Sequence, residues 1–582
     1  MTYSKRFSGE DDRTIETIET EILILGSGGA GLYAALCAYD NNPRLRIVLV
    51  GRGLLGKGGC SRLVQGGLNV VLNENDSIDM HFKDTLKGGA FINDQEMVWT
   101  LVNDAPKVVH ELEVKYGLFL DRGKDGNIHQ KPFAGQSFDR TVHVADLTGI
   151  QIMGRLADQI HSRDITVTEE TRALDLLTTD NGSRVIGAVL LNVRTGEIFI
   201  VNSKVTIVAT GGAASMYKVF ATSTDKSGDG VAMCFRAGVK FVDMEMLQFH
   251  PTGLLVADSH LTGVILEEGL RGAGARLYNG LGERFMERYD PQNMERATRD
   301  VVSRAGYLEI LAGRGTAEGG VLLDPSHLGA KFVEENFPGM CERVRDMGQD
   351  LAREGAVVSP SAHYMMGGAK IDIYCQTNLQ GLLVAGEDAG GTHGANRLGG
   401  NGICDSLVFG RRAGDTAAKL AVQQKLRPYQ QAQAEETKER WLRPFYIDSN
   451  EGIYTVRDEL KNLTWQDIGL VRNGKQLKRA IKRLDELMEL TEHIGLANKS
   501  LKRYNMEWND IINVTNWITV ARMLAKSALY RKESRGAHYR EDFPDRDDKN
   551  WLCNIYLRKM NGSDIEISSK PVEFTRKDLN EV

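Results

Sequence analysis

Histidine and arginine residues set among glycines carry the clearest chemistry of this sequence. His250 precedes a proline in Gln-Phe-His-Pro-Thr-Gly, and His363 precedes Tyr-Met-Met-Gly-Gly. His393 and Arg397 belong to one segment, His-Gly-Ala-Asn-Arg-Leu-Gly-Gly. Arginine can bind a carboxylate through two parallel hydrogen bonds, and histidine can donate a further one. The pattern predicts a site that binds a carboxylated substrate, although a single histidine is more often a hydrogen-bonded residue of the core.

An acidic and a basic residue nearby are spaced for mutual contact. Glu268 and Arg271 lie three positions apart in Glu-Glu-Gly-Leu-Arg, so one helical turn would bring carboxylate and guanidinium together. Thr298-Arg299-Asp300 then opens an apolar run. A surface ion pair, which contributes little to stability, is the alternative. The residues alone therefore leave the role of this pair open.

A strand, a glycine turn and a helix are expected at the start of the chain. Residues 21–31 read Glu-Ile-Leu-Ile-Leu-Gly-Ser-Gly-Gly-Ala-Gly. In the pattern Gly26-x-Gly28-x-x-Gly31 the first glycine permits a tight turn, the second lets a diphosphate approach, and the third lets helix and strand pack closely. Free N–H groups at the helix start would face the anion. The motif predicts a bound dinucleotide, and a turn that needs glycine for conformational reasons alone is the alternative.

The other expected strands indicate one nucleotide-binding sheet with an insertion. A strand at residues 46–50 ends in Gly51-Arg52 and lacks the acidic residue that often holds an adenosine ribose, which weakens NAD and leaves FAD open. Further strands are expected at 184–191, 197–201 and 205–208, and at 381–385, with glycine turns at 211–212 and 386. The segment of about 239–354 would then form a second domain. After residue 425, Leu477, Ile481, Leu484 and Met488 mark an amphipathic helix, and residues 514–532 predict another.

Composition narrows the class of protein. The chain has 582 residues, a formal net charge of −6 and no extended basic run, which argues against a nucleic-acid partner. No apolar stretch reaches the roughly 18 residues of a membrane span, and no signal-peptide pattern is present, so we expect a soluble, cytoplasmic chain. The seven cysteines form no Cys-x-x-Cys pair. We therefore expect no metal site here and place any iron-sulfur cluster in a partner.

Motifs in order across residues 20–420 resemble the flavoprotein subunit of succinate dehydrogenase and fumarate reductase, a family that also contains L-aspartate oxidase. Besides the motifs above, the chain carries Val64-Gln-Gly-Gly-Leu68, Lys131-Pro-Phe-Ala-Gly-Gln-Ser137, Ala209-Thr-Gly-Gly212 and Gly228-Asp-Gly230. Residues 533–548, Glu-Ser-Arg-Gly-Ala-His-Tyr-Arg-Glu-Asp-Phe-Pro-Asp-Arg-Asp-Asp, are similar to the dehydrogenase and reductase branch more than to the oxidase branch.

The resemblance implies an α/β fold: a Rossmann-like FAD-binding domain interrupted by a capping domain and followed by a C-terminal helical domain. The expected boundaries are 1–238 and 355–425 for the FAD-binding domain, 239–354 for the capping domain, 426–535 for the helical domain and 536–582 for a tail. FAD would lie across the main sheet with the capping domain over its isoalloxazine ring. A C4 dicarboxylate between them would exchange a hydride with flavin N5 and a proton with a side chain.

The resemblance also implies roles for individual residues. Arg299 would transfer the proton, relayed by Glu268 and Arg271. Because arginine stays protonated in proteins, it would have to be reprotonated at once in a closed, dry pocket. The implied substrate-binding residues are His250, Thr252, Glu267, His363 and Arg397. The implied cofactor-binding residues are Gly26, Gly28, Gly29, Ala30, Gly31, Arg52, Cys60, Ser61, Gln65, Gly66, Gly67, Ala209, Thr210, Gly211, Asp229, Glu387, His393 and Asn401.

Two positions depart from the family pattern. Cys60 stands where the respiratory enzymes have the histidine that bonds covalently to the flavin, so we expect non-covalent FAD, with a cysteinyl link at Cys60 as the alternative. Glu267 replaces the threonine before the relay glutamate. A fixed negative charge a few ångströms from a substrate carboxylate would cost on the order of 1–4 kcal/mol, so Glu267 is neutral, points away, or faces a different substrate group.

Three hypotheses follow. The first is a fumarate reductase or succinate dehydrogenase flavoprotein subunit that passes electrons to an iron-sulfur partner. The charged segment from Arg540 to Lys549 would be its docking surface or else a solvated one, and membrane contact would come only through partner subunits on the cytoplasmic face. The second is an FAD-dependent oxidoreductase of another organic or amino acid, as in L-aspartate oxidase, with Glu267 paired to an ammonium group. The third is a non-catalytic flavin-binding assembly subunit.

Overall fold

A seven-stranded sheet forms the centre of the chain, and its strand order is β6-β2-β1-β9-β8-β7, with β16 also paired to β9. The computed structural model describes residues 15–179, 181–256, 259, 261–449, 451–560, 562 and 564–581. Residues 1–14, where the first predicted domain begins, lie outside them. Pairing is parallel from β6 to β9 and β16 and antiparallel through β8 and β7. The strand bounds are β1 Thr17–Leu25, β2 Ile47–Val50, β6 Thr166–Thr168, β7 Thr171–Thr178, β8 Val185–Asn192, β9 Glu197–Val208 and β16 Leu382–Val384.

Helices cover this sheet because its central strands are apolar on both faces. Residues 22–25 and 47–50 are all buried, as expected for parallel strands. Helix α1 (Gly29–Asn41) contacts both α4 (Thr148–His161) and α12 (Asn401–Gln423), and α5 (Asp229–Arg236) packs against β7. The glycine turn at residues 26–31 therefore lies at the carboxyl end of a central strand, where α/β folds place ligands.

The prediction of two separate strands at 197–201 and 205–208 is wrong, because β9 is one continuous strand over Glu197–Val208. Its first half pairs with β8 and its second half with β1, so the backbone stays extended through residues 202–204. Asn202 and Ser203, which lie between the two expected strands, are buried in the sheet. Their side chains are polar, but their backbone groups belong to the ladder.

A small second sheet and three helices lie in the segment between β2 and β6. Strands β3 (Leu68–Asn69), β5 (Thr141–Val142) and β4 (Gln130–Lys131) pair in that order. They follow η1 (Cys60–Leu63) and lie near α2 (Ile78–Gly88) and α3 (Gln95–Val114). This segment, residues 51–165, brings residues 65–67 and 131–137 close together, since a Cβ on Gly66 would lie 2.3 Å from the Phe133 ring.

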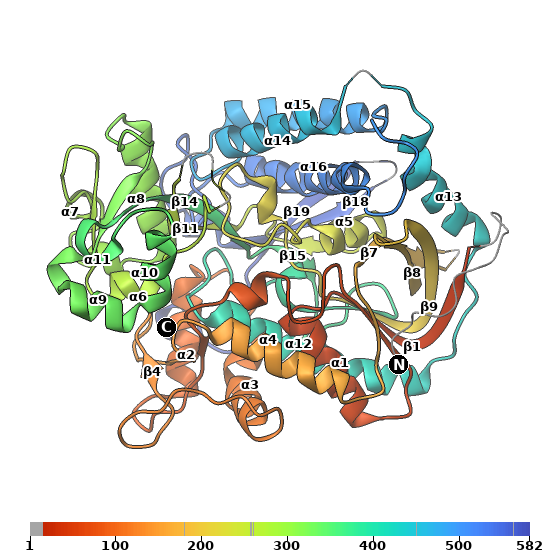
Figure 1. Cartoon of the computed structure of the whole chain (residues 1–582), viewed down its shortest axis with the longest axis horizontal. Helices are drawn as coiled ribbons and strands as arrows, with labels where there is room; N and C mark the ends of the chain where they lie inside the picture. Colours follow the sequence, from red (N-terminus) through yellow and green to blue (C-terminus); the bar gives the residue numbers. More distant parts are fainter. Residues whose placement is uncertain are drawn as a thin grey trace.

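The insertion forms a module with a core of its own, drawn in green in Figure 1. Its sheet has the order β11-β14-β13-β12, and it extends past the expected boundary at 354 because β14 pairs with both β11 and β13. The strands are β11 Leu247–Leu254, β12 Arg276–Tyr278, β13 Val321–Asp324 and β14 Ala356–Met365. The helices are α6 Glu268–Gly272, α7 Met286–Tyr289, α8 Arg299–Leu311, α9 Ala330–Asn336, α10 Pro338–Arg345 and α11 Leu351–Glu354.

Helices dominate the chain after residue 425, and they share one continuous core with the central sheet. They are α13 Gln431–Leu442, α14 Ile453–Asp467, α15 Gly474–Thr491 and α16 Met506–Tyr530. In α15, Leu477 and Leu484 of the predicted stripe are buried and Ile481 and Met488 are half-buried. Helix α16 begins earlier than expected, because the Asn505 side chain accepts a hydrogen bond from the Trp508 amide and caps it. Within the described ranges, no helix has the length and apolarity needed to cross a membrane.

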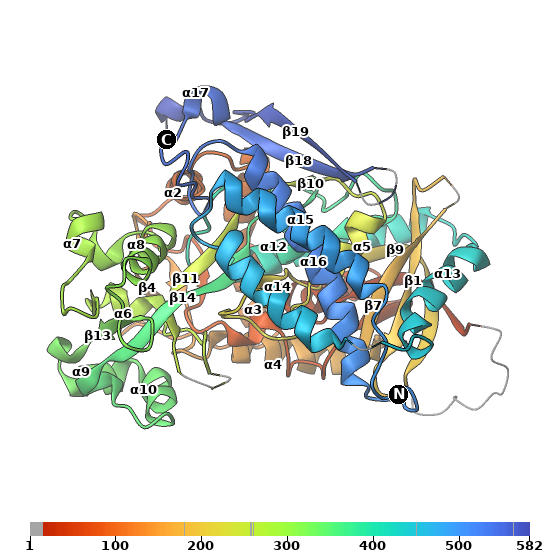
Figure 2. The same cartoon turned by 90° about the horizontal axis from the view of Figure 1, so that it is seen from above.

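The tail completes a fourth sheet and is fixed by a buried arginine. Strands β18 (Cys553–Lys559) and β19 (Ile565–Pro571) extend β10 (Phe241–Val242), β15 (Gly368–Lys370) and β17 (Ala389–Gly390), and they lie beside α17 (Asp548–Trp551) in Figure 2. Arg531 is fully buried, with its Nε 2.8 Å from a Glu245 oxygen and its Nη1 2.8 Å from a Glu533 oxygen. It also donates to the Trp551 and Cys553 carbonyls at 3.1 and 2.9 Å. One guanidinium thus joins the insertion, α16 and the tail.

Candidate active site

The turn after β1 has a backbone path that only glycine allows. Gly26 has a φ of +114°, and a Cβ there would lie 2.1 Å from the Ala209 carbonyl oxygen. A Cβ on Gly31 would lie 1.8 Å from the Gly26 oxygen. Helix α1 then starts at Gly29 without a side-chain cap, and the Gly29 amide reaches only the Ser61 hydroxyl at 3.0 Å. Uncapped N–H groups at a helix start form a cradle for a diphosphate.

A cavity of about 130 Å³ lies against this turn. The strand ends of β1, β2 and β9 and the start of α5 form its walls. Of the predicted cofactor-binding residues, it is lined by Gly26, Gly28, Gly29, Ala30, Arg52, Cys60, Ser61, Ala209, Thr210, Gly211, Asp229 and Glu387. The glycine cradle and this lining fit the diphosphate and adenosine parts of FAD.

Charged side chains in this cavity hold one another in place. Arg172, which sequence reasoning missed, donates to Asp229 at 2.6 Å, and Arg52 Nη1 lies 3.9 Å from Asp229. Burial tends to raise the pKa of Asp229, but Arg172 and Arg52 keep it below its ordinary value. A second missed residue, Asp388, accepts a hydrogen bond from the Gly211 amide at 2.8 Å, and burial raises its pKa to about 7. Both carboxyl groups orient the loops that form the walls.

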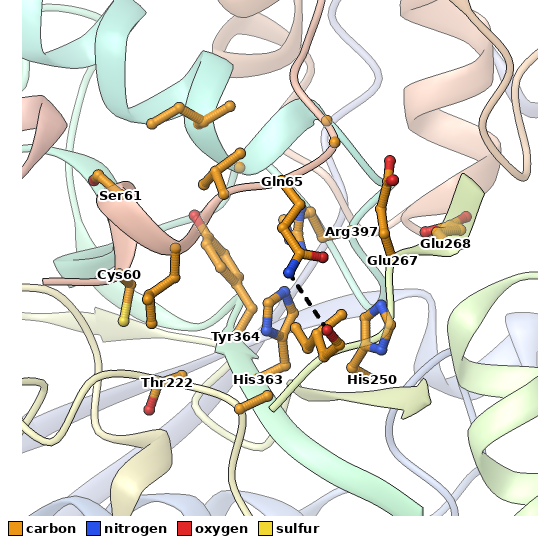
Figure 3. Close-up of a pocket in the computed structure, with 18 of the residues that line it drawn as sticks. Cys60, Ser61, Gln65, Thr222, His250, Glu267, Glu268, His363, Tyr364 and Arg397 are labelled. Atoms are coloured by element: carbon orange, nitrogen blue, oxygen red, sulfur yellow. Dashed lines mark hydrogen bonds between the residues drawn. The ribbon is translucent and has the colours of Figure 1, made fainter. Parts of the chain in front are cut away.

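A second cavity of about 150 Å³ adjoins the first. The two share the lining residues Cys60, Ser61, Lys226, Glu387 and Ser406. At this junction Lys226 Nζ lies 2.5 Å from a Glu387 oxygen and donates to the His363 carbonyl at 3.1 Å. Figure 3 shows Cys60 and Ser61 on one side of the second cavity and Glu267 and Glu268 on the other. A ligand that spans the junction would therefore have one part in the cradle and another beside these carboxylates.

Arg299 and Arg397 meet at a shared amide in the second cavity. Arg299 Nε lies 2.7 Å from Glu268 Oε2, and its Nη1 lies 3.3 Å from Gln248 Oε1. Arg397 Nη2 donates to the same Gln248 oxygen at 3.1 Å. No carboxylate in the described part of the chain lies within ion-pair distance of Arg397, and its Nε has no hydrogen-bond partner there. Arg397 is therefore a buried cation without a counter-ion, and burial together with Arg299 lowers its pKa to about 10.

The expected contact between Glu268 and Arg271 is not the one that forms. Glu268 pairs with Arg299 and accepts a hydrogen bond from the Ala134 amide at 3.2 Å. Arg271 lies behind the cavity lining, where it donates to the Glu295 carbonyl. Burial tends to raise the pKa of Glu268, and the charges of Arg299 and Arg271 hold it below its ordinary value. Arg271 thus acts on Glu268 electrostatically rather than through a hydrogen bond.

Two buried histidines face each other in the cavity wall. The rings of His250 and His363 are 5.5 Å apart, centroid to centroid, at an angle of 70°. Burial, then the nearby arginines, lower the pKa of both rings well below the ordinary value, so both are neutral at neutral pH. Thr252 does not reach the cavity lining, because its hydroxyl donates to the Leu266 carbonyl at 2.7 Å. Its amide and hydroxyl lie 3.3 Å from His250 Nδ1 and fix the ring.

Glu267 lines the cavity and has a cation behind it. Its Oε1 lies 2.9 Å from Lys131 Nζ, and Lys131 itself is outside the lining. Burial raises the pKa of Glu267, whereas Lys131 opposes the shift. Lys131 belongs to a motif that the sequence offered, but nothing in the sequence linked it to a residue 136 positions away.

Three other predicted cofactor-binding residues lie outside both cavity linings. His393 contacts the Tyr364 hydroxyl at 3.3 Å, and Asn401 accepts a hydrogen bond from Asn69 at 2.7 Å. Gly31 packs under the turn, as described above. These residues support the walls, while Gln65, Gly66 and Gly67 line the second cavity beside Glu267.

Cys60 lies at the junction of the two cavities, where the Ser223 amide donates to its sulfur at 3.4 Å. Burial raises the pKa of the Cys60 thiol. A thiol held in its protonated form is a poor nucleophile, because the thiolate is the reactive species. The local environment therefore disfavours a covalent bond at this position.

Comparisons with known proteins cover nearly the whole chain. Residues 21–403 match the family model described as FAD binding domain, and residues 457–581 match the one described as fumarate reductase flavoprotein C-term. The chain is 42% identical over 545 residues to an FAD-dependent oxidoreductase of Methanocaldococcus jannaschii, covering 93% of this chain and 96% of the relative. It is 41% identical over 549 residues to one of the subunits of fumarate reductase (CoM/CoB) of Methanothermobacter marburgensis, covering 94% of this chain and 98% of the relative.

Solved structures give the same result. A flavoprotein chain of E. coli quinol fumarate reductase superposes with a TM-score of 0.91 at 32% identity, covering 97% of this chain and 98% of that one. The similarity extends over the central sheet, the insertion, the helices and the tail.

Proposed function

This chain belongs to the flavoprotein family of fumarate reductase and succinate dehydrogenase, and we propose that it is the FAD-bearing subunit of such an enzyme. It is an FAD-dependent oxidoreductase that acts on a CH–CH group, with a C4 dicarboxylate as substrate. The observation that carries the proposal is the second cavity, which joins the glycine cradle and holds the Arg299–Glu268 pair beside Arg397.

Different residues of the chain would bind FAD and the substrate. Gly26, Gly28 and Gly29 would hold FAD at its diphosphate, and the bound FAD supplies two-electron transfer to and from carbon. Arg397 would bind a substrate carboxylate, because no carboxylate of the described residues neutralises it, with the neutral imidazoles of His250 and His363 as additional donors.

Arg299 would hold the proton for the substrate carbon. Its Nε is fixed by Glu268 and its Nη1 by Gln248. After Arg299 has given its proton to the substrate carbon, Glu268, ionised because Arg299 and Arg271 surround it, would accept a new proton from solvent by way of Arg271 and pass it to Arg299. Burial of all these groups excludes the water that would otherwise compete.

The direct test is turnover with purified, FAD-loaded protein. A chemically reduced dye should drive conversion of fumarate to succinate, and succinate should reduce an oxidising dye more slowly, because non-covalent flavin has a lower reduction potential. Loaded protein that turns over neither acid would contradict the proposal.

A second candidate, an oxidoreductase of an amino acid as in L-aspartate oxidase, is favoured by one observation. Glu267 places a carboxyl group in the cavity lining, where an ammonium group could pair with it. L-Aspartate should then bleach the flavin faster than succinate does. We expect the opposite order, because Lys131 already forms an ion pair with Glu267 and would compete with an ammonium group.

FAD is expected to be non-covalent. After acid precipitation the yellow colour should stay in the supernatant, because burial keeps the Cys60 thiol protonated. The flavin absorbance of pellet and supernatant measures this, with Cys60→Ser as the matched variant. A yellow pellet that becomes colourless in C60S would establish the cysteinyl link instead.

An iron-sulfur subunit is the proposed electron partner, since the sequence offers no cluster ligands in this chain. Residues 541–550 are exposed apart from the half-buried Asp547 and would dock it, whereas Arg540 is buried and binds Asp542 and backbone carbonyls. Association with the cytoplasmic face of a membrane would come through such partners.

A further inference from the structure

Three carboxylates line the second cavity within the described residues, and Glu267 is the one whose ion-pair partner lies outside the lining. Its negative charge would repel the proposed dicarboxylate. Its neighbour Glu268 is paired to Arg299 in the lining itself. The counter-ion of Glu267, Lys131, lies behind the wall. An added Cβ on Gly66 would lie 3.1 Å from Glu267 Oε1, so the carboxyl group packs closely against the loop that lines the cavity.

Few charges face this carboxyl group. Lys131 of β4 attracts it, while Asp146 before α4 and Glu268 of α6 repel it. Helix α10 contributes an uncharged contact, since the Glu267 amide donates to the Met340 sulfur at 3.1 Å, and Arg343 of the same helix donates to the Ile265 carbonyl. Phe133 and Gly66 are the uncharged neighbours in the lining. One cation thus opposes two anions and burial, and the balance raises the pKa of Glu267.

Three other titratable groups of the wall keep one charge state near neutral pH. Burial and nearby cations lower the pKa of His250 and of His363 well below the ordinary value, which keeps both neutral. Glu268 stays ionised beside its two arginines. Glu267 is thus a group of the lining whose protonation can respond to substrate binding, whereas Asp388, whose pKa burial raises to about 7, lies outside this lining.

We infer that Glu267 takes up one proton from solvent when a dicarboxylate binds, and that its O–H then donates a hydrogen bond to the substrate carboxylate. In the family, a threonine hydroxyl stands at this position, and a protonated carboxyl group supplies the same O–H donor. Lys131 is the positioning residue that sets how readily the proton is taken up, because its ammonium group favours the ionised form. This inference rests on the proposed function, since it presumes a dicarboxylate in this cavity.

The test is calorimetric titration of the oxidised, FAD-loaded protein with fumarate, which binds there without turnover. In buffers of different ionisation enthalpy, binding at a pH above the pKa of free Glu267 should take up close to one proton. The Kd should be constant at low pH and rise by up to about tenfold for each pH unit above the pKa of free Glu267.

Two variants locate the effect. Glu267→Gln keeps an N–H donor and loses the titration, so binding should take up no proton and Kd should not depend on pH. Lys131→Met removes the cation that favours ionisation, so the rise in Kd should begin at higher pH than in the unchanged protein. Flavin absorbance per chain reports whether each variant is folded.

Three results would overturn the inference: no proton uptake by the unchanged protein, an E267Q variant with the same pH dependence, or tighter binding of L-aspartate than of fumarate at alkaline pH. The proposed function fails separately, if fumarate neither binds nor is reduced at any pH. Fumarate reduction with pH-independent binding would remove only the role of Glu267.

Discussion

Replacing Arg299 with glutamine is expected to lower the rate of dye-driven fumarate reduction by about 100- to 10,000-fold, the usual contribution of a positioned proton donor. Arg299 donates hydrogen bonds to Glu268 at 2.7 Å and to Gln248 at 3.3 Å, which hold its guanidinium in the cavity lining. Glutamine retains hydrogen-bonding capacity but cannot deliver a proton and recover it from Glu268. The steady-state kcat with a reduced dye measures the loss.

Arg296→Gln is the matched control. Arg296 is exposed, and its guanidinium donates to the Gly272 carbonyl at 3.0 Å, outside the cavity lining. Its replacement should leave kcat within about twofold, a change of only a few tenths of a kcal/mol. Flavin content should be normal in both proteins. An R299Q enzyme that retained near-normal kcat would remove Arg299 from the chemistry.

Replacing Arg531 with methionine is expected to destabilise the fold by about 3–5 kcal/mol, because it leaves the buried carboxylates of Glu245 and Asp243 without their cation. Glu533, in contrast, keeps Arg535 at 2.7 Å. Glu245 and Glu533 each lie 2.8 Å from this guanidinium, and all three side chains are fully buried. The loss also leaves the Cys553 carbonyl without the donor that fixes the start of β18. The shift of the urea-unfolding midpoint, scaled by the slope of the transition, measures the effect.

Arg558→Met is the control for this change, since Arg558 forms an exposed pair with Glu566 at 2.7 Å. A surface pair of this kind contributes about 0–1 kcal/mol. Equal shifts in the two variants would show that burial of the Arg531 cluster contributes nothing to stability.

The sequence predicted the cradle well because its signal is local. A strand, three spaced glycines and a helix follow one another within residues 21–31, and the backbone clashes that exclude larger residues arise within that unit and at Ala209. The strand after residue 381 was equally local, and β16 forms at Leu382–Val384. Periodicity likewise found α15, whose buried residues recur at helical spacing.

What the sequence could not predict depends on contacts between distant segments. Lys131 pairs with Glu267 only because residues 51–165 and the insertion pack against each other. Gln248 likewise contacts both Arg299 and Arg397 only in the folded chain. Gln248 lies two positions before His250, so the sequence motif included it. Its contacts with both arginines could not be predicted, because they depend on the folded structure.

Local spacing misled in one place. Glu268 and Arg271 are one turn apart, yet Glu268 pairs with Arg299, because that guanidinium reaches it from α8 at 2.7 Å. The role of Thr252 came only from the family resemblance and stays a prediction; its hydroxyl donates to the Leu266 carbonyl.

In the cavity beside the cradle, bound FAD and a C4 dicarboxylate are proposed to exchange two electrons. The most direct test of this exchange is an anaerobic titration of the fully reduced, FAD-loaded protein with fumarate, followed by flavin absorbance and succinate analysis. The account predicts that equimolar fumarate reoxidises the flavin and yields an equal amount of succinate. Flavin that stays reduced in excess fumarate, in protein shown to be folded and fully loaded, would contradict it.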